Sequence, residues 1–232
     1  MAAVPSYFLS DVHLRYDFPD RADRLARFVE GLGPEDDLTI VGDLCDFWFA
    51  SRQLDGSPLR CAGLAALASF RARGGSLTIL AGNHDAWLGP FYESTLGARF
   101  VRDALEFERD GLRILAVHGH LLKAATPWKK LLNSRTFLGG FRLLPDLAAN
   151  ALDGLLNRTN RRNQAKFDRR GISAYREHVA GLRDLYDLVI LGHVHLPVYE
   201  QSNRPMMVVL GGWQERGCHF RINKGECIHF VD

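Results

Sequence analysis

The stretch Leu38-Thr-Ile-Val-Gly-Asp-Leu-Cys-Asp46 places a short apolar run directly before a glycine and two carboxylates. Such a run, bounded by a turn signal, predicts a buried β-strand. The arrangement recurs four times, each time with Asp, Asn or His after the apolar residues. Together with one further apolar run, these patterns predict strands at 7–9, 38–41, 77–80, 113–117, 188–191 and 207–210.

Between the strands, the segments 21–32, 61–73 and 172–185 carry apolar residues at helical spacing, so the chain is predicted to be α/β. Segments 218–222 and 226–230 flank Asn223-Lys-Gly225 and predict a closing antiparallel hairpin. Residues 121–171 mix apolar and basic residues in a helical pattern and predict a cap insertion above the sheet. We therefore expect a single domain, 1–232, that carries this insertion.

The composition is that of a folded protein, since 47% of the 232 residues are hydrophobic and 24% are charged. The 29 Lys and Arg nearly balance the 27 Asp and Glu, so the net charge gives no reason to expect a nucleic-acid partner. The four cysteines form no C-x-x-C pair, and neither a signal peptide nor a transmembrane run of about 20 apolar residues is evident. We expect a cytoplasmic protein; peripheral contact with the inner membrane and the oligomeric state stay open.

Motifs rich in Asp, Asn and His follow five predicted strands. Ligands bind at the carboxyl ends of strands in open α/β sheets, so these loops should converge on one cleft. Their side chains hold divalent metals through oxygen and nitrogen. Each motif alone is more often a turn, a helix cap or a surface histidine pair, but five in order are not explained by chance. The motifs are Ser10-Asp11-Val12-His13, Gly42-Asp43-Leu44-Cys45-Asp46, Gly82-Asn83-His84-Asp85, His118-Gly119-His120 and Gly192-His193-Val194-His195.

This ordered set resembles the calcineurin-like metallophosphoesterase superfamily across nearly the whole chain. The resemblance implies a four-layer αββα sandwich, in which two packed sheets are flanked by helices, with a dinuclear metal centre at the strand ends. Two metals so placed suit attack on phosphorus, and the resemblance favours Mn²⁺ among the ions that mixed sites accept. It implies that one metal is held by Asp11, His13 and His195, the other by Asn83, His118 and His193, and that both are bridged by Asp43.

His84 follows a candidate ligand, so we expect it beside the metals, where it protonates the leaving oxygen or stabilises phosphoryl charge. The resemblance implies that Asp46 keeps the His84 imidazole protonated and aimed. Asp85 is interpreted as helix-capping structure. His120 is interpreted as a neighbour that hydrogen-bonds a ligand. The other histidines, His178, His219 and His229, are expected to lie outside the site.

Three longer stretches narrow the resemblance to the UDP-2,3-diacylglucosamine diphosphatase family of lipid A biosynthesis. They are Ser10-Asp-Val-His-Leu14, Gly42-Asp-Leu-Cys-Asp-Phe-Trp48 and Gly192-His-Val-His-Leu-Pro197. The resemblance implies cleavage of the diphosphate of a lipid nucleotide to UMP and a diacylglucosamine 1-phosphate, with the insertion sheltering the acyl chains. Two positions differ, because that family usually has Arg where this chain has His84 and Asp where it has His120.

The insertion contains an apolar stretch, 137–156, followed by a basic one, 158–176. The apolar stretch either binds acyl chains or the membrane interface, or packs the insertion onto the body; the two readings are even. A solvated helix face is the usual explanation of such a basic run. Beside a phosphatase cleft, however, Arg161, Arg162 and Lys166 are candidates for binding a diphosphate or an anionic bilayer surface.

The sequence thus predicts a metal-dependent hydrolase of a lipid-nucleotide diphosphate. One alternative is a phosphodiesterase or phosphatase for another small nucleotide or phospholipid. A second is a non-catalytic binding scaffold on the same fold, which the retained candidate ligands and His84 argue against. A nuclease is disfavoured, because the basic run adjoins an apolar stretch and lacks the interleaved aromatic residues of a nucleic-acid groove.

Overall fold

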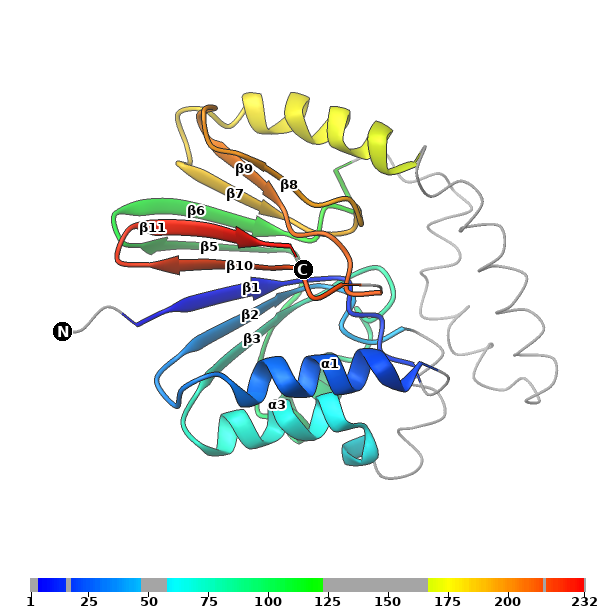
Figure 1. Ribbon diagram of the computed structural model, residues 1–232. Helices are drawn as coiled ribbons and strands as arrows, with labels where there is room; N and C mark the ends of the chain where they lie inside the picture. Colours follow the sequence, from blue (N-terminus) through cyan, green and yellow to red (C-terminus); the bar gives the residue numbers. More distant parts are fainter. Residues whose placement is uncertain (1–3, 16–17, 47–57, 123–166, 215, 232) are drawn as a thin grey trace.

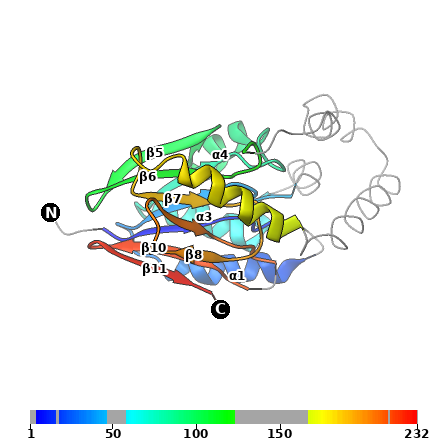
Figure 2. The same ribbon diagram turned by 90° about the horizontal axis from the view of Figure 1, so that it is seen from above.

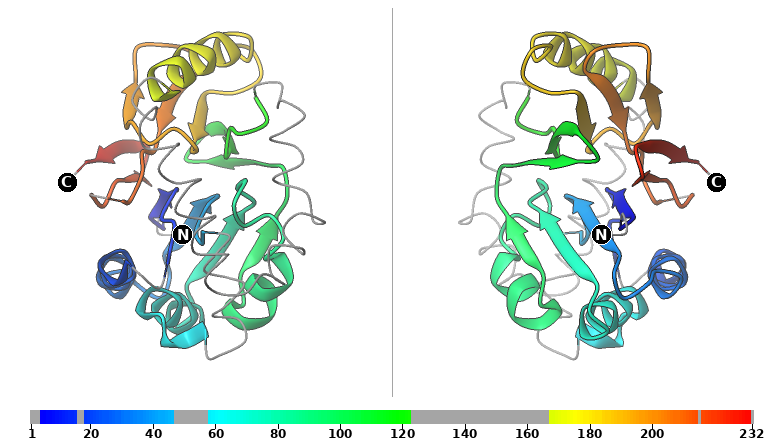
Figure 3. Two further views of the ribbon diagram at one scale, coloured as in Figure 1. Left: turned by 90° about the vertical axis from the view of Figure 1, so that its right-hand side faces the viewer. Right: turned by 90° about the vertical axis from the view of Figure 1, so that its left-hand side faces the viewer.

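Two β-sheets lie face to face, with helices on the outer side of each (Figure 1). The structure is a computed structural model that describes residues 4–15, 18–46, 58–122, 167–214 and 216–231. Viewed along the sheets, the layers run helix, sheet, sheet, helix (Figure 3). The expected four-layer αββα sandwich is therefore confirmed.

The first sheet has the order β11-β10-β1-β2-β3-β4 in the described residues. Its parallel strands are β1 (Ser6–Leu9), β2 (Asp37–Val41), β3 (Ser76–Leu80) and β4 (Arg99–Val101). The antiparallel hairpin of β10 (His219–Asn223) and β11 (Glu226–Phe230) extends it beside β1. The sequence-predicted closing hairpin is thus present and sits at the edge of this sheet.

The second sheet has the order β5-β6-β7-β9-β8 in the described residues. Its central strands, which are parallel, are β6 (Leu112–Val117), β7 (Leu188–Leu191) and β9 (Met206–Val209). The edges are the antiparallel strands β5 (Ala104–Arg109) and β8 (Val198–Glu200). All six strands predicted from the apolar runs are present, with boundaries that differ by at most one residue.

The described elements that escaped prediction include the six-residue strand β5 and three others. β4 and β8 have three residues each and α4 (Gly89–Leu96) has eight, too few to show a clear period. The helices α1 (Pro19–Glu30) and α3 (Ala62–Ala72) match two predicted segments. The helix predicted at 172–185 is described at 167–180. It ends earlier than predicted because the chain turns at Gly181, whose amide bonds the carbonyl of His178. The predicted cap residues 123–166, including the apolar stretch 137–156, lie outside the described residues.

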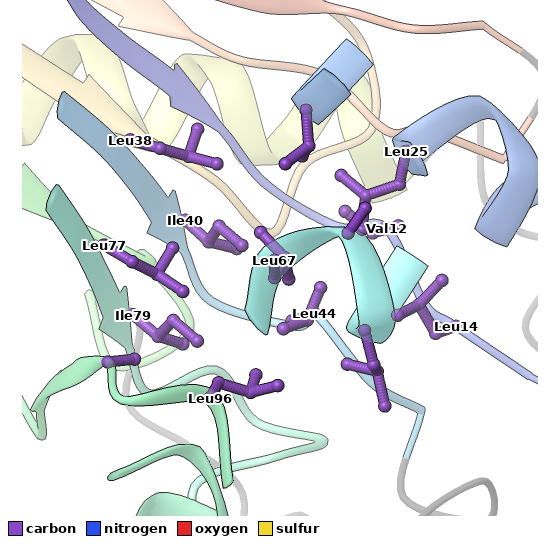
Figure 4. Packing of buried hydrophobic residues seen from close by; sticks show 14 of the residues in the cluster. Val12, Leu14, Leu25, Leu38, Ile40, Leu44, Leu67, Leu77, Ile79 and Leu96 are labelled. Carbon is purple, nitrogen blue, oxygen red and sulfur yellow. The ribbon is translucent and has the colours of Figure 1, made fainter. Parts of the chain in front are cut away.

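Alternating side chains on each buried strand fill different layers of the core. On β1, Phe8 packs between the two sheets, whereas Leu9 packs toward α1 and α3. Figure 4 shows Leu25 of α1 and Leu67 of α3 against strand residues that include Ile40. Each fully buried leucine contributes about 1.5–3 kcal/mol relative to its exposed state. Each sheet is therefore buried on both faces, by the other sheet and by its own helices.

Helix 167–180 covers the outer face of the second sheet, where it lies along β7, β8 and β9 (Figure 2). Its buried residues Ile172, Tyr175 and Val179 pack on Val189 and Leu191 of β7. The strands β1, β2, β3, β6 and β7 all carry their carboxyl ends to one edge of the sandwich. The five motifs that follow these strands consequently meet there.

Candidate dinuclear metal centre

Four of the predicted ligands have a left-handed backbone conformation. The φ angles are +54° at Asp11, +48° at His13, +54° at Asp43 and +64° at His193. Residues other than glycine pay for this conformation, and such strain concentrates at functional sites. The remaining described examples, Asp110 and Lys224, lie in tight turns between strands. The fold thus holds these four backbones in costly conformations at the edge where the motifs meet.

One candidate cluster surrounds Asp11. Its Oδ2 accepts hydrogen bonds from the His193 amide (2.8 Å) and from the Ser10 hydroxyl. Its Oδ1 lies 3.7 Å from His13 Nε2 and 3.4 Å from His195 Nε2. Within the described residues, Asp11 Oδ1 and His13 Nε2 are buried without a hydrogen-bond partner. Because buried polar atoms are rarely left unpaired, these two atoms fit a cation held between them.

A second candidate cluster is formed by Asp43, His118 and His193, whose ligand atoms lie within 4.8 Å of one another. Asp43 Oδ1 accepts the His84 amide at 2.9 Å. Asp43 Oδ2 lies 3.2 Å from His118 Nε2 and 3.8 Å from His13 Nε2. One carboxylate oxygen thus stands between the two clusters, as a bridging ligand must.

A backbone hydrogen bond orients the His118 ring. Its Nδ1 donates to the carbonyl of Val41 at 2.8 Å, so Nε2 is the nitrogen that faces Asp43 and lies 3.2 Å from Asn83 Oδ1. Gly42, at φ +82°, permits this approach, because a Cβ there would run into the His118 ring. The glycine of the second motif is therefore required by the histidine of the fourth.

Burial and neighbouring charges shift the pKa values within these clusters. Burial disfavours the ionised form of Asp43, but His118 and His84 outweigh it and hold the pKa of that carboxyl well below its usual range. Burial also opposes charge on His118, yet Asp43 raises the pKa of His118 to about 9. Burial and then His118 lower the pKa of His193 to about 3. Asp43 is thus anionic and His193 neutral, whereas His118 must give up its proton before it can hold a divalent cation.

His84 and Asp46 form a contact beside the clusters. His84 Nδ1 lies 2.9 Å from Asp46 Oδ1, and the other oxygen of Asp46 accepts from the buried Arg15 at 3.2 Å. Burial alone would lower the pKa of His84, but Asp43 and Asp46 raise it to about 10. The His84 ring stands edge-on to the His13 ring at 4.8 Å between centroids. A protonated imidazole therefore faces the place where both clusters meet.

Asp85 does not cap a helix, which corrects the sequence interpretation. The N-cap residue of α4 is Leu88, and the helix has no side-chain capping hydrogen bond at this end. The Asp85 carboxylate instead accepts the amides of Leu44 (2.8 Å) and Gly82 (2.9 Å) and the Tyr92 hydroxyl (2.9 Å). Asp85 thus joins the loop of Asp43 to the loop of Asn83, because it accepts one amide from each.

His120 lies beside the second cluster, with ring centroids 5.3 Å from His118 and 6.3 Å from His193. Its buried Nδ1 makes no hydrogen bond to a described residue, so the expected bond to a ligand is not seen at that atom. Burial and the His118 charge lower the pKa of His120 to about 4. A third group of candidate ligand atoms in the described residues joins His13, Asp43 and His84. His219 stacks on Phe230 and belongs to none of the three groups.

Sequence reasoning missed the residues that hold the motif loops in place. Arg15 lies two residues after the first motif and contacts Asp46, while Arg21 Nη1 donates to the carbonyl of His13 at 2.9 Å. A buried arginine among metal loops gives no signal in the sequence, because its burial depends on strands far along the chain. The candidate substrate residues Arg161, Arg162 and Lys166 lie outside the described residues.

This fold and the two facing clusters are those of a phosphoesterase, and comparison with known families agrees. The chain belongs to the calcineurin-like phosphoesterase family, whose model matches residues 4–197. The family uses divalent metals, and the described residues supply groups able to hold them. The members of this family are metal-dependent hydrolases.

Its relatives carry a more particular name. A UDP-2,3-diacylglucosamine hydrolase of Aeromonas salmonicida is 37% identical over 120 residues, and the match spans 51% of this chain and 46% of that protein. The chain thus matches about half the length of this relative. The enzyme of that name from Aeromonas hydrophila subsp. hydrophila is 26% identical over 234 residues, covering 96% of both chains. Among solved structures, an archaeal phosphodiesterase covers 99% of this chain and is itself fully covered, with 16% identity and a TM-score of 0.49.

Proposed function

We propose that this protein hydrolyses the diphosphate of a UDP-2,3-diacylglucosamine-like lipid nucleotide to UMP and a diacylglucosamine 1-phosphate. The relative from Aeromonas hydrophila that matches over 96% of both chains supports this substrate. The position of Asp43 Oδ2, 3.2 Å from His118 Nε2 and 3.8 Å from His13 Nε2, is the observation that carries the two-metal chemistry. A diphosphate bond is the kind of bond that a pair of divalent ions is suited to break.

We propose that one ion is held by Asp11, His13 and His195, the other by Asn83, His118 and His193, and that Asp43 bridges them. When bound, two divalent ions supply the charge that neutralises phosphoryl oxygens and activates water. We take Mn²⁺ as the native ion. The buried unpaired atoms of Asp11 and His13 support the ligand set of the first ion.

His84 and Asp46 are the proposed catalytic pair. His84 holds a proton near neutral pH because two carboxylates stabilise its charge, and its exposed edge can deliver that proton to the leaving phosphate oxygen. Asp46 fixes the ring through Nδ1, so the proton on Nε2 is the one available for transfer. Arg15 on the other oxygen of Asp46 keeps this carboxylate from rotating away.

The substrate's charged and acyl parts are proposed to meet the cap at 121–171 of a single domain, 1–232. Arg161, Arg162 and Lys166 would bind the diphosphate or an anionic lipid surface. Replacing all three by glutamine should raise KM for the lipid nucleotide far more than KM for a small artificial phosphoester. Equal effects on both substrates would contradict this role.

We propose that the protein works at the cytoplasmic face of the inner membrane, where a lipid nucleotide is accessible. No described helix has the length and apolar character needed to cross a bilayer. Sedimentation with vesicles of anionic phospholipid, at low and high salt, tests peripheral binding, since electrostatic attachment weakens as salt rises. A protein that stays in the supernatant under both conditions would contradict it.

A phosphodiesterase or phosphatase of another small nucleotide or phospholipid is the second candidate. The His84–Asp46 pair favours it, because the family of the leading proposal usually has Arg at this position. Incubation of the Mn²⁺-loaded protein with each candidate substrate, followed by chromatographic detection of UMP, separates the two. Release of UMP from the lipid nucleotide supports the leading proposal, while its absence alongside turnover of another ester supports the second.

A further inference from the structure

Helix 167–180 contacts the loops of the proposed metal ligands, so its role rests on the proposed function. This helix is the first described segment after residue 166, and it packs on the outer face of the second sheet (Figure 2). Besides filling the core, it contacts both loops that bring histidines to the Asp43 cluster. These are the loop of His118 and the loop of His193 and His195.

Tyr175 stands between the two loops. Its hydroxyl, in a side chain that is only 2% exposed, donates to the carbonyl of Gly192 at 3.1 Å. The same hydroxyl lies against Gly119, where an added Cβ would overlap it. Gly192 precedes His193 and Gly119 follows His118, so one side chain sets the distance between the two backbones.

Other residues of the helix hold the His193 loop from the same side. The Phe167 ring stands edge-on to His193, with centroids 5.6 Å apart and an interplanar angle of 84°. Asp168 Oδ1 accepts the His195 amide at 3.4 Å. Gly171 lies so close to Val194 that a Cβ at this position would stand 2.5 Å from Val194 Cγ2. The loop therefore rests on three successive points of one rigid element.

We propose that Tyr175 is a positioning residue for the Asp43, His118 and His193 cluster, and that its hydroxyl and ring fix the separation of His118 and His193. The two imidazole centroids lie 5.3 Å apart at 66° in the structure. A hydroxyl that bonds the Gly192 carbonyl restrains the His193 backbone, which is already held at a costly φ of +64°. Without that bond the left-handed turn has one restraint fewer, so the second metal loses affinity.

Tyr175→Phe tests this directly, because the ring that packs on the Gly119 loop remains and only the hydroxyl is lost. Reconstituted protein is titrated with Mn²⁺ by equilibrium dialysis, and the exchange-coupled signal of a manganese pair is followed by electron paramagnetic resonance. We expect the weaker Mn²⁺ site to lose about 10- to 100-fold in affinity, the size of effect that outer partners of metal ligands have. The coupled signal should weaken, and kcat should fall while KM stays near its original value.

Tyr199→Phe is the matched control. Tyr199 lies on β8, away from the cluster, and packs on Phe220. Tyr199→Phe also removes one tyrosine hydroxyl. Because Tyr199 lies away from the cluster, the Mn²⁺ affinity is expected to stay unchanged. Gly171→Ala is a second test that leaves the hydroxyl intact, since its methyl group pushes the helix from Val194. It should also weaken the second Mn²⁺ site.

The outcomes separate this inference from the proposed function. Wild-type protein that binds fewer than two Mn²⁺ contradicts the proposed function, whatever Tyr175 does. Wild-type protein that binds two, together with Tyr175→Phe and Gly171→Ala variants of unchanged affinity and signal, overturns the positioning role alone. A lower urea midpoint of the metal-free variant with normal Mn²⁺ affinity also overturns it, because that result describes a purely structural residue.

Discussion

Asp43 Oδ2 lies 3.2 Å from His118 Nε2, while His118 Nδ1 is bound to the carbonyl of Val41 on the strand that leads to Asp43. The histidine of the second sheet is thus aimed by the strand that presents its carboxylate partner. This closed set of contacts joins the two sheets at the candidate metal centre and makes Asp43 the residue on which both clusters depend.

Asp43→Asn is expected to abolish the bridging charge while keeping the side-chain volume. Loss of a partner outside the ligand sphere costs about 10- to 100-fold, so loss of a bridging ligand should lower kcat by more than about 100-fold. The bound metal should fall below two ions per chain, measured by atomic absorption after desalting. Asp110→Asn, in an exposed turn, serves as the control. Two tightly bound ions in Asp43→Asn would contradict the bridging role.

His84→Ala should separate proton transfer from metal binding. We expect kcat to fall by about 10²- to 10⁴-fold, the usual contribution of a positioned general acid, with two ions still bound. Asp46→Asn should have a smaller effect of the same kind, because it removes only the group that aims the imidazole. A substrate with a very acidic leaving group should largely restore the rate of His84→Ala. If it does not, His84 acts otherwise than by protonating the leaving oxygen.

Asp85→Ala is predicted to destabilise the fold without removing a candidate ligand. The amides of Leu44 and Gly82 lose their acceptor in a buried site, at about 1–3 kcal/mol for each group left unpaired. Urea unfolding of the metal-free protein measures the loss. Tyr92→Phe removes a single bond to the same carboxylate and should cost about 1 kcal/mol. Equal losses in the two variants would refute the joining role of Asp85.

A matched pair of leucines tests the layered core. Leu188 begins β7 and is fully buried between the sheets, whereas Leu185 is 59% exposed three residues earlier. Leu188→Ala should lower the free energy of unfolding by about 2–5 kcal/mol, and Leu185→Ala by less than about 0.5 kcal/mol. Thermal denaturation of both variants checks the difference. If Leu188→Ala lowered the free energy of unfolding only slightly, the core between the sheets would have to collapse into the space left by the missing side chain, against the expectation of a tightly packed core.

Metal removal should abolish activity reversibly. After chelation and dialysis, we expect turnover to return on addition of Mn²⁺, with Zn²⁺ and Mg²⁺ compared at equal free concentrations. Circular dichroism before and after chelation serves as a check that the fold is retained. Full activity in a chelated sample verified to hold no metal would exclude the two-metal chemistry.

Much of the site could be predicted because its parts are local in sequence. Apolar runs such as 188–191 and the polar residues after them are adjacent along the chain, and parallel strands bring such ends to one edge. The predicted residues Asp11, Asp43, His118, His193 and His195 do meet there. The helix-cap interpretation of Asp85 was wrong, because a carboxylate near a helix start suggests a cap. Its carboxylate instead binds the nearby Gly82 amide and the Leu44 amide, which belongs to a loop 41 residues away.

The sequence by itself determined which residue types follow each strand, and with them the class of chemistry. Each motif is a continuous segment, so the order of the motifs can be read along the chain. Only the tertiary structure decided which oxygen and which nitrogen face the clusters. Asp11 offers Oδ1 because Ser10 and the His193 amide occupy Oδ2, and His118 offers Nε2 because Val41 occupies Nδ1. Tyr175 holds two loops that are more than 70 residues apart in the chain. Such choices depend on hydrogen-bond partners from distant strands, and no local pattern records them.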